Sequence, residues 1–446
     1  MKNILIIAYY YPPKGGAGVQ RSAKLAKYLN KLGYKVHVLT VEKNIPGIID
    51  ESLMVDIHEN IRVYRTGMKK IISLDFFINK FRKKSNVESI IKPEQNPPKQ
   101  KTFINFIKRI IIDFFLILNI PDDKKGWINY AIKEGNKIIK EQNIDLIYST
   151  SAPTSAHFIG RKLKEKNSIP WIADFRDSWA DNKAANYNTI IRFIYGKLEK
   201  QIIYKADKII SVSKPIVDNF SDKYISVAKS KFHVIPNGYD EDDFVNLDLK
   251  KHNSNEKFEI LYNGTLYANE DPSTFFIVLH NLINMGKLDT NKILIKFNGD
   301  MGAYQREIVN YYSSIYPGVI CQNNYKNHAE SIRDFESANA LLLILGEGKG
   351  VEGVYSGKIF EYIRANKPII GIVPNGVARD LIIDSKTGYT ATASDTNRIQ
   401  EILLELYSNF IGNKNNQVFN PRWEVIEQFS RESLTKKLVA ISESLK

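Results

Sequence analysis

Cysteine is almost absent from this sequence, because Cys321 is the only one among 446 residues. An intrachain disulfide and a cysteine-based metal site are therefore excluded, and a reducing compartment fits the chain. Long apolar runs are missing too, since no stretch reaches the roughly 18 consecutive apolar residues that indicate a transmembrane helix. The apolar residues 4–8 lead into two prolines and a glycine loop without a small-residue cleavage site, which predicts a buried strand rather than a signal peptide. Together these features predict a cytoplasmic protein.

Positive charge is abundant and unevenly placed. The net charge is +14, and residues 69–109 hold eleven basic and three acidic residues, a local net of +8. Phe76, Phe77 and Phe103 interleave with these charges, and an apolar run continues to residue 118. Basic and large apolar residues together suit an anionic membrane surface, so the segment 69–118 predicts peripheral association with the inner face of the cell membrane. A solvated loop followed by a core helix explains the segment equally well. No nucleic-acid-binding motif accompanies the charge, so a nucleic-acid partner is not expected.

Strand and helix patterns alternate along the whole chain and stop once, at the polar stretch 240–257. Strands are predicted before this linker at residues 3–8, 35–41, 144–149, 169–174, 207–212 and 231–235. After it they are predicted at residues 258–262, 292–297, 340–345 and 368–373. The pattern indicates an α/β protein with two doubly wound parallel-sheet domains, 1–238 and 258–415, which face a cleft. Ligands are expected at the carboxyl ends of the strands.

The segment after residue 355 carries the most informative chemistry. Ser356 is a candidate N-cap, and the backbone N–H groups that begin the helix at Gly357 favour a phosphate. Lys358 adds a positive charge for the same phosphate. Glu361 lies one turn further on the same face, where its carboxylate could accept the two hydroxyls of a ribose. This arrangement is typical of a nucleotide-sugar site, although a solvated Lys358–Glu361 pair is the plainer alternative.

A glycine loop follows the first predicted strand and contains Gly15, Gly16 and Gly18. Glycines at the start of a helix allow a ligand to approach the backbone closely. A dinucleotide fingerprint would need a further glycine where the sequence has Arg21, although Glu42 stands where a ribose-binding acid would follow. A dinucleotide enzyme and an ordinary tight turn therefore remain alternatives for this loop.

Three further segments place polar groups at predicted strand ends. Asp177 is a candidate for orienting a sugar or acceptor hydroxyl, and Arg176 for contacting a phosphate, although a structural Asp–Arg pair is equally compatible. His157 begins a helix near the same rim, where a single histidine is more often structural. Asn263, Gly264 and Thr265 follow the first strand of the second domain and could offer backbone donors to a diphosphate. The acidic residues 240–243 do not make a convincing metal site, and none is predicted.

Several of these segments together resemble the retaining glycosyltransferases of family 4, which have the GT-B fold. The resemblance covers nearly the whole chain and rests on the order and spacing of its motifs. Residues 9–16 resemble the family's opening, and residues 172–179 a signature of its polysaccharide-assembly members. Residues 234–240 resemble the motif before the linker, and residues 357–362 the nucleotide-binding motif.

The resemblance implies transfer of a sugar from a nucleoside-diphosphate sugar, here expected to be a UDP-sugar, with retention of configuration and without a metal or cofactor. A lipid-linked or glycan acceptor in cell-surface polysaccharide synthesis, such as capsule or lipopolysaccharide, is implied as well. Residues 416–446 resemble the closing helices that return to the first domain. The implied roles are catalysis by Asp177, Lys358 and Glu361, donor binding by the segments 263–265 and 356–361, and acceptor contacts by Gly15, Gly16, Gly18, Arg176 and His157.

Two departures from the family pattern are visible. The family has a second glutamate eight residues before the ribose-binding one, and this chain has Gly353 there. The family also carries an arginine and a lysine after the glycine of the second domain, where this chain has Thr265, Leu266 and Asn269. Lys358 is therefore expected to be the main cation for the diphosphate. A nucleotide-sugar 2-epimerase of the same architecture and a non-catalytic membrane-binding scaffold are the alternatives.

Overall fold

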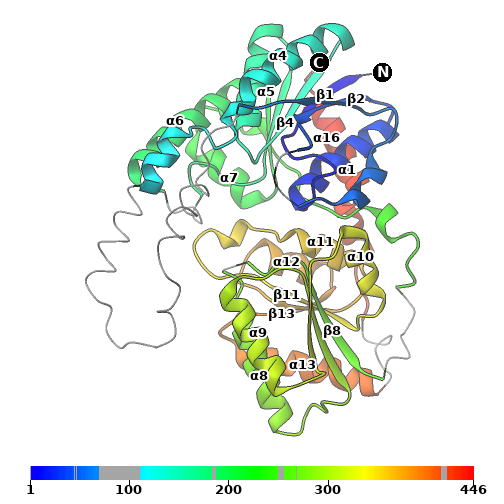
Figure 1. Ribbon diagram of the computed structural model, residues 1–446. Helices are drawn as coiled ribbons and strands as arrows, with labels where there is room; N and C mark the ends of the chain where they lie inside the picture. The colour runs from blue at the N-terminus through cyan, green and yellow to red at the C-terminus, as the bar shows by residue number, and fades with distance from the viewer. Residues whose placement is uncertain are drawn as a thin grey trace.

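Two α/β domains make up the protein, as Figure 1 shows. The computed structural model describes residues 2–44, 46, 48–69, 111–182, 187–249, 256–267, 269–412 and 419–445. The basic residues 80–84 and most of the predicted membrane-facing segment lie outside these ranges. No helix in the described ranges has both the length and the apolar character needed to span a bilayer.

The first domain contains a seven-stranded sheet in the order β3-β2-β1-β4-β5-β6-β7, and each neighbouring pair is parallel. Its strands are β1 (Asn3–Ile7), β2 (Lys35–Val41), β3 (Arg62–Thr66), β4 (Leu146–Thr150), β5 (Trp171–Phe175), β6 (Lys208–Ser211) and β7 (Phe232–Val234). The strand order reverses between β1 and β4, so the loops after these two strands diverge and leave a crevice above the sheet.

The second domain contains a six-stranded parallel sheet in the order β10-β9-β8-β11-β12-β13. Its strands are β8 (Phe258–Asn263), β9 (Ile293–Asn298), β10 (Ile320–Asn323), β11 (Ala340–Ile344), β12 (Ile369–Ile372) and β13 (Gly388–Ala391). The order reverses between β8 and β11, which places a second crevice beside the loops after these strands. The prediction of two doubly wound parallel-sheet domains is confirmed.

Helices cover both faces of each sheet, and Figure 1 shows them around the strands. Those of the first domain are α1 (Ala17–Lys31), α4 (Ile128–Gln142), α5 (Ser155–Asn167), α6 (Thr189–Lys205) and α7 (Lys214–Lys223). Those that follow are α8 (Ser273–Asn284), α9 (Ala303–Ile315), α10 (His328–Arg333), α11 (Gly357–Arg364), α12 (Val377–Asp384), α13 (Thr396–Ile411), α15 (Trp423–Ile426) and α16 (Arg431–Glu443). Residues 111–118 are also helical.

Three strands were not predicted from the sequence, namely β3, β10 and β13. All three lie at the edge of a sheet. β3 is an edge strand of the first sheet, and β10 and β13 are the two edge strands of the second. Edge strands are short and keep polar residues because one side of the backbone stays accessible. In β3 the two arginines and a threonine hide the apolar pattern, and β10 ends in Gln322 and Asn323.

The chain crosses between the domains twice, and the two crossings run side by side. Tyr239 forms an isolated bridge with Ser430, and the backbone N–H of Arg431 donates to the carbonyl of Tyr239 at 2.7 Å. Beyond this point α16 packs on the first domain, where Leu434 and Leu438 join the core that includes strand β1. Figure 1 accordingly shows α16, in red, in the upper domain beside the N-terminus.

Candidate active site

A cleft separates the carboxyl ends of the two sheets and has a volume of about 360 Å³. Its walls come from three segments that the sequence analysis singled out. They are the glycine loop after β1, the loop after β5, and the residues that precede α11, and they contribute Gly15, Gly18, Arg176, Asp177, Gly353 and Tyr355. The structure therefore brings together loops that lie more than a hundred residues apart in the sequence.

The helix α11 begins beside this cleft with an open N-terminus. Ser356 is its N-cap residue in extended conformation, and its hydroxyl makes no capping hydrogen bond. Gly357 is exposed and the Ser356 side chain is half-buried. The helix is held in place by its opposite face, since Ile359, Phe360 and Ile363 belong to the core. An anchored helix with exposed leading N–H groups suits a bound phosphate.

Lys358 points from α11 toward the end of strand β8. Its ammonium donates to the carbonyl of Thr265 at 3.1 Å and to the hydroxyl of Tyr262, and lies 3.6 Å from the Glu270 carboxylate. The ammonium also lies 4.3 Å from the centre of the Tyr262 ring. Burial lowers the pKa of Lys358, and the Glu270 carboxylate opposes this effect. The side chain is only 11% exposed, so its charge acts in a weakly screened environment.

The predicted segment 263–265 lies next to Lys358, but its three residues play different parts. Gly264 is exposed and has a φ of +106°, and a Cβ there would lie 3.3 Å from the Lys358 side chain, so glycine is required. The Asn263 side chain is buried, where it donates to the carbonyl of Ser331 and accepts from Asn298. The Asn263 side chain therefore supports the strand ends, and its backbone N–H, predicted as a donor to the diphosphate, donates to the hydroxyl of Tyr362 at 2.9 Å.

Glu361 is 21% exposed and has a partner that the sequence did not predict. Its Oε1 atom lies 3.0 Å from Nε2 of His328, which begins α10. The backbone N–H of His328 in turn donates to Asp50 of the first domain at 3.0 Å. A single histidine in a polar loop carries no sequence signal for this role, because its partners come from residues 50 and 361.

The glycine loop contacts Arg176, which comes from the loop after β5 in the same domain. A Cβ at Gly18 would lie 2.6 Å from the Arg176 guanidinium, so a larger residue there would displace this side chain. Gly16 has a φ of +102° and is the N-cap of α1. Arg176 donates to the carbonyls of Ser151 and Ala152, the latter at 3.0 Å. These contacts fix the guanidinium at the cleft wall.

Asp174, near the end of strand β5, is paired with Arg21, which the sequence analysis mentioned only because a dinucleotide fingerprint would have a glycine there. Arg21 binds both Asp174 oxygens, at 2.8 and 2.7 Å, and both side chains are buried. Tyr148 and Thr150 donate to the same carboxylate. Arg21 lowers the pKa of Asp174 against the effect of burial. The structural Asp–Arg pair is therefore Asp174–Arg21, which leaves Arg176 and Asp177 at the cleft.

Asp177 opens onto the cleft and also onto a second cavity of about 490 Å³ beside it. Tyr10, Ala152 and Asp177 line both spaces, so the two cavities adjoin at these residues. Desolvation by the surrounding walls raises the pKa of Asp177, and the neighbouring Arg176 partly offsets this. A carboxylate at the junction of two cavities is well placed to contact groups from both.

His157 does not lie on the cleft rim, and its predicted acceptor contact is wrong. The side chain is fully buried, and its Nδ1 atom lies 2.8 Å from the hydroxyl of Ser149. Its ring packs 4.4 Å from that of Phe175. Burial lowers the pKa of His157 to about 3, so the ring is neutral. His157 thus belongs to the core behind β5.

Comparisons with known proteins agree with this geometry. Residues 89–243 match the family model Glycosyltransferase Family 4. No curated protein matches the chain significantly in sequence. Among solved structures, Anabaena HepE in complex with UDP and glucose has a TM-score of 0.61 at 12% identity, with both chains covered completely. The lipopolysaccharide outer core galactosyltransferase WaaB has a TM-score of 0.56 at 12% identity, also with both chains covered completely.

A third solved structure is similar in fold as well. Sucrose-phosphate synthase from Thermosynechococcus elongatus has a TM-score of 0.57 at 13% identity, with 100% of this chain and 99% of that chain covered. At such identities these likenesses concern the fold, while the family match concerns the sequence itself. The likeness to glycosyltransferase family 4 therefore covers residues 89–243, and the solved structures show that the whole chain shares their two-domain fold.

Proposed function

We propose that the protein is a glycosyltransferase of family 4, which moves a sugar from a UDP-sugar to a lipid-linked or glycan acceptor in cell-surface polysaccharide synthesis. Configuration at the sugar is retained and no metal takes part. The carrying observation is the pair Lys358 and Glu361 on one short helix, whose open N-terminus adjoins the cleft facing the glycine loop. The α11 N-terminus and Lys358 would bind the diphosphate, and Glu361 would accept the ribose hydroxyls.

Charge stabilisation and orientation would supply the catalysis. Negative charge develops on the departing diphosphate as the glycosidic bond breaks, and preorganised donors lower the barrier at that point. Lys358 and the N–H groups at the start of α11 are such donors. Asp177 would orient the acceptor hydroxyl from the junction with the second cavity. HepE supports UDP as the nucleotide, because its structure contains UDP and glucose.

The second cavity is our candidate for the acceptor site. It extends from Asp177 to Phe115 and Leu116 on the helix at residues 111–118. Trp179, Tyr187 and Tyr195 line it as well. A pocket lined by polar groups such as Asp177 together with aromatic and apolar side chains suits a sugar carried on a lipid.

The outer surface beside this cavity has the composition of a membrane-binding face. Phe114 and Phe193 are 62% and 61% exposed, and Leu118 and Ile190 are exposed too. Leu116 packs on the cluster that contains Ile191 and Tyr195, so the helix at residues 111–118 and α6 lie together. The exposed part of α6 also carries Arg192, Lys197 and Lys200. Exposed apolar residues flanked by cations suit an anionic bilayer.

Nucleotide binding tests the donor part of the proposal. UDP in large excess over its Kd should raise the melting temperature by several degrees, since binding at 100 times Kd stabilises a protein by about 2.7 kcal/mol. Differential scanning fluorimetry with UDP, GDP and ADP measures this, and the shift should persist in EDTA because no metal is required. The absence of a shift with all three nucleotides would favour the scaffold alternative.

Vesicle binding tests the membrane part. Phe114→Asp combined with Phe193→Asp should weaken binding to phosphatidylglycerol vesicles about ten-fold or more, because two large exposed apolar side chains are replaced by charges that anionic lipid repels. Co-sedimentation measures the effect. Ile277→Asp is the matched control, since Ile277 is an exposed apolar residue on α8 of the other domain. Equal loss in the control and the double variant would contradict this membrane face.

The nucleotide-sugar 2-epimerase remains the alternative enzyme with this architecture. It needs no acceptor, so incubation with UDP-N-acetylglucosamine alone separates the two activities. An epimer formed without acceptor would decide for it. The second cavity that adjoins the cleft at Asp177 favours the transferase, because a reaction within one sugar has no use for an acceptor pocket.

A further inference from the structure

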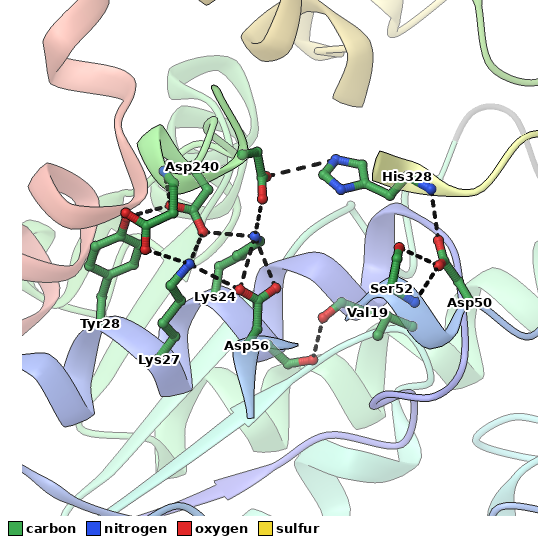
Figure 2. A network of polar contacts seen from close by, with 12 residues as sticks. Val19, Lys24, Lys27, Tyr28, Asp50, Ser52, Asp56, Asp240 and His328 are labelled. Atoms are coloured by element: carbon green, nitrogen blue, oxygen red, sulfur yellow. Dashed lines mark hydrogen bonds and ion pairs between the residues drawn. The ribbon is translucent and has the colours of Figure 1, made fainter. Parts of the chain in front are cut away.

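A polar network joins the two domains and reaches Glu361 of α11. Figure 2 shows it from close by. Lys24 of α1 lies 2.9 Å from Asp56 and 2.7 Å from Asp240, and all three side chains are buried. Lys27 makes a second contact with the same Asp240, at 2.6 Å. Tyr28 donates to the other oxygen of Asp240. Asp240 immediately follows the first interdomain crossing, so α1 fixes the start of the second domain.

His328 is the residue at which this network reaches Glu361. Lys24 also lies 2.7 Å from Asp243, and Asp243 lies 3.9 Å from Nε2 of His328. The same Nε2 atom lies 3.0 Å from Glu361. On its backbone side, His328 donates to Asp50, a contact that Figure 2 shows across the interface. One residue therefore contacts the candidate ribose-binding acid and the first domain at once.

The hydrogen bond between His328 and Glu361 can run in one direction only. An ionised carboxylate only accepts, so Nε2 of His328 carries the hydrogen and donates to Glu361. Burial and Lys24 oppose protonation of His328, but the carboxylates of Glu361 and Asp243 outweigh them and raise its pKa. Asp50 faces the backbone N–H of His328 from the first domain. The histidine therefore holds one Glu361 oxygen and fixes the plane of its carboxylate.

We propose that His328 is a positioning residue, which holds the Glu361 carboxylate in the orientation that accepts the ribose hydroxyls. Asp50 makes this orientation depend on contact between the domains, because it binds the first turn of the helix that carries His328. The inference rests on the proposed function, since it assumes that Glu361 binds ribose. By linkage, a nucleotide that uses the oriented carboxylate also favours the contact with Asp50.

Discrimination between ribose and deoxyribose tests the role of His328. The Kd values of UDP and 2′-deoxy-UDP are measured by calorimetry for the wild type, His328→Ala and His328→Gln, or with GDP or ADP and its 2′-deoxy form if that base binds best. His328→Ala should lose about ten-fold in affinity for the ribonucleotide and much less for the deoxynucleotide, because a charge-assisted hydrogen bond that orients the acid is removed. His328→Gln should recover most of the preference, since its amide N–H reaches about the position of Nε2.

Asp50→Asn tests the part played by the domain contact. The amide keeps one accepting oxygen for Ser52 but leaves the N–H of His328 without a carboxylate, so the preference for ribose should fall by about three-fold. Asp222→Asn on the exposed surface of α7 is the matched control and should bind as the wild type does.

Each outcome bears on a separate part of the inference. Equal losses for both nucleotides in His328→Ala, or no loss for either, would overturn the positioning role while wild-type binding still supports the donor site. Unchanged ribose preference in Asp50→Asn would overturn the dependence on domain contact. If the wild type binds none of UDP, GDP and ADP, the proposed function fails and this inference fails with it.

Discussion

Glu361→Gln should reduce kcat/KM for the donor by about 100-fold and leave the fold intact. The amide keeps one accepting oxygen and replaces the other with a donor, so at least one charge-assisted hydrogen bond to a ribose hydroxyl is lost and a second is weakened. Hydrogen bonds to charged groups contribute about 1.5–3 kcal/mol each, and a total of about 3 kcal/mol corresponds to roughly 100-fold. Steady-state kinetics with varied UDP-sugar measure the effect.

Glu307→Gln is the matched control for this experiment. Glu307 lies exposed on α9, so the same substitution there should leave kinetics and melting temperature unchanged. Glu361 is itself part of the domain interface through His328, so the melting temperature of Glu361→Gln without ligand must be compared with that of the wild type. A stable Glu361→Gln variant with full activity would remove Glu361 from the donor site.

The fold was predictable because buried strands in a parallel sheet are nearly continuous apolar runs. Strands β1, β8, β11 and β12 are such runs, and all of them lie inside their sheets. Strands β3, β10 and β13 lie at sheet edges and were not predicted, because their polar residues interrupt the apolar pattern, whereas the edge strand β7 was predicted at residues 231–235. The helix α11 was predictable for a related reason, since its cap, its apolar face and its polar face all lie within ten residues.

The site was predictable only where its chemistry is local in sequence. Ser356, Lys358 and Glu361 share one helix, so their common face follows from helical spacing. The partners of Glu361 and Asp174 are instead His328 and Arg21, which are 33 and 153 residues away. Pairing at such separations depends on the order of the strands in the sheets. Periodicity along the chain does not determine that order.

The acidic residues 240–243 also have partners that the sequence could not predict. From the sequence alone they are assigned to a polar linker, and no metal site is predicted there. In the structure Asp240 is buried, and Lys24, Lys27 and Tyr28 lower its pKa against the effect of burial. Phe244 is buried as well. The first part of the linker is therefore an ordered connection between the two domains.

Lys358→Met should lower kcat on the order of 1,000-fold, with a smaller effect on KM, which is the largest change expected of any single substitution here. Removing one preorganised donor from a site of developing negative charge costs about 100- to 1,000-fold in kcat. The higher figure is expected because the chain has Thr265 and Leu266 where its relatives carry further cations, so fewer groups remain to compensate. Methionine keeps the length of the buried stem, and rapid-quench or steady-state assays measure the loss.

The substitution also leaves Glu270 buried without its cation, which would destabilise the fold for a reason unrelated to catalysis. The double variant Lys358→Met/Glu270→Gln removes that carboxylate and should restore the melting temperature but not the activity. Lys287→Met, at an exposed residue in the turn that follows α8, is the matched surface control. Since burial lowers the pKa of Lys358, wild-type kcat/KM should fall as pH rises through that lowered value, where the ammonium loses its proton. Activity recovered together with stability in the double variant would show that Lys358 supports the fold and leaves the diphosphate to the helix N-terminus alone.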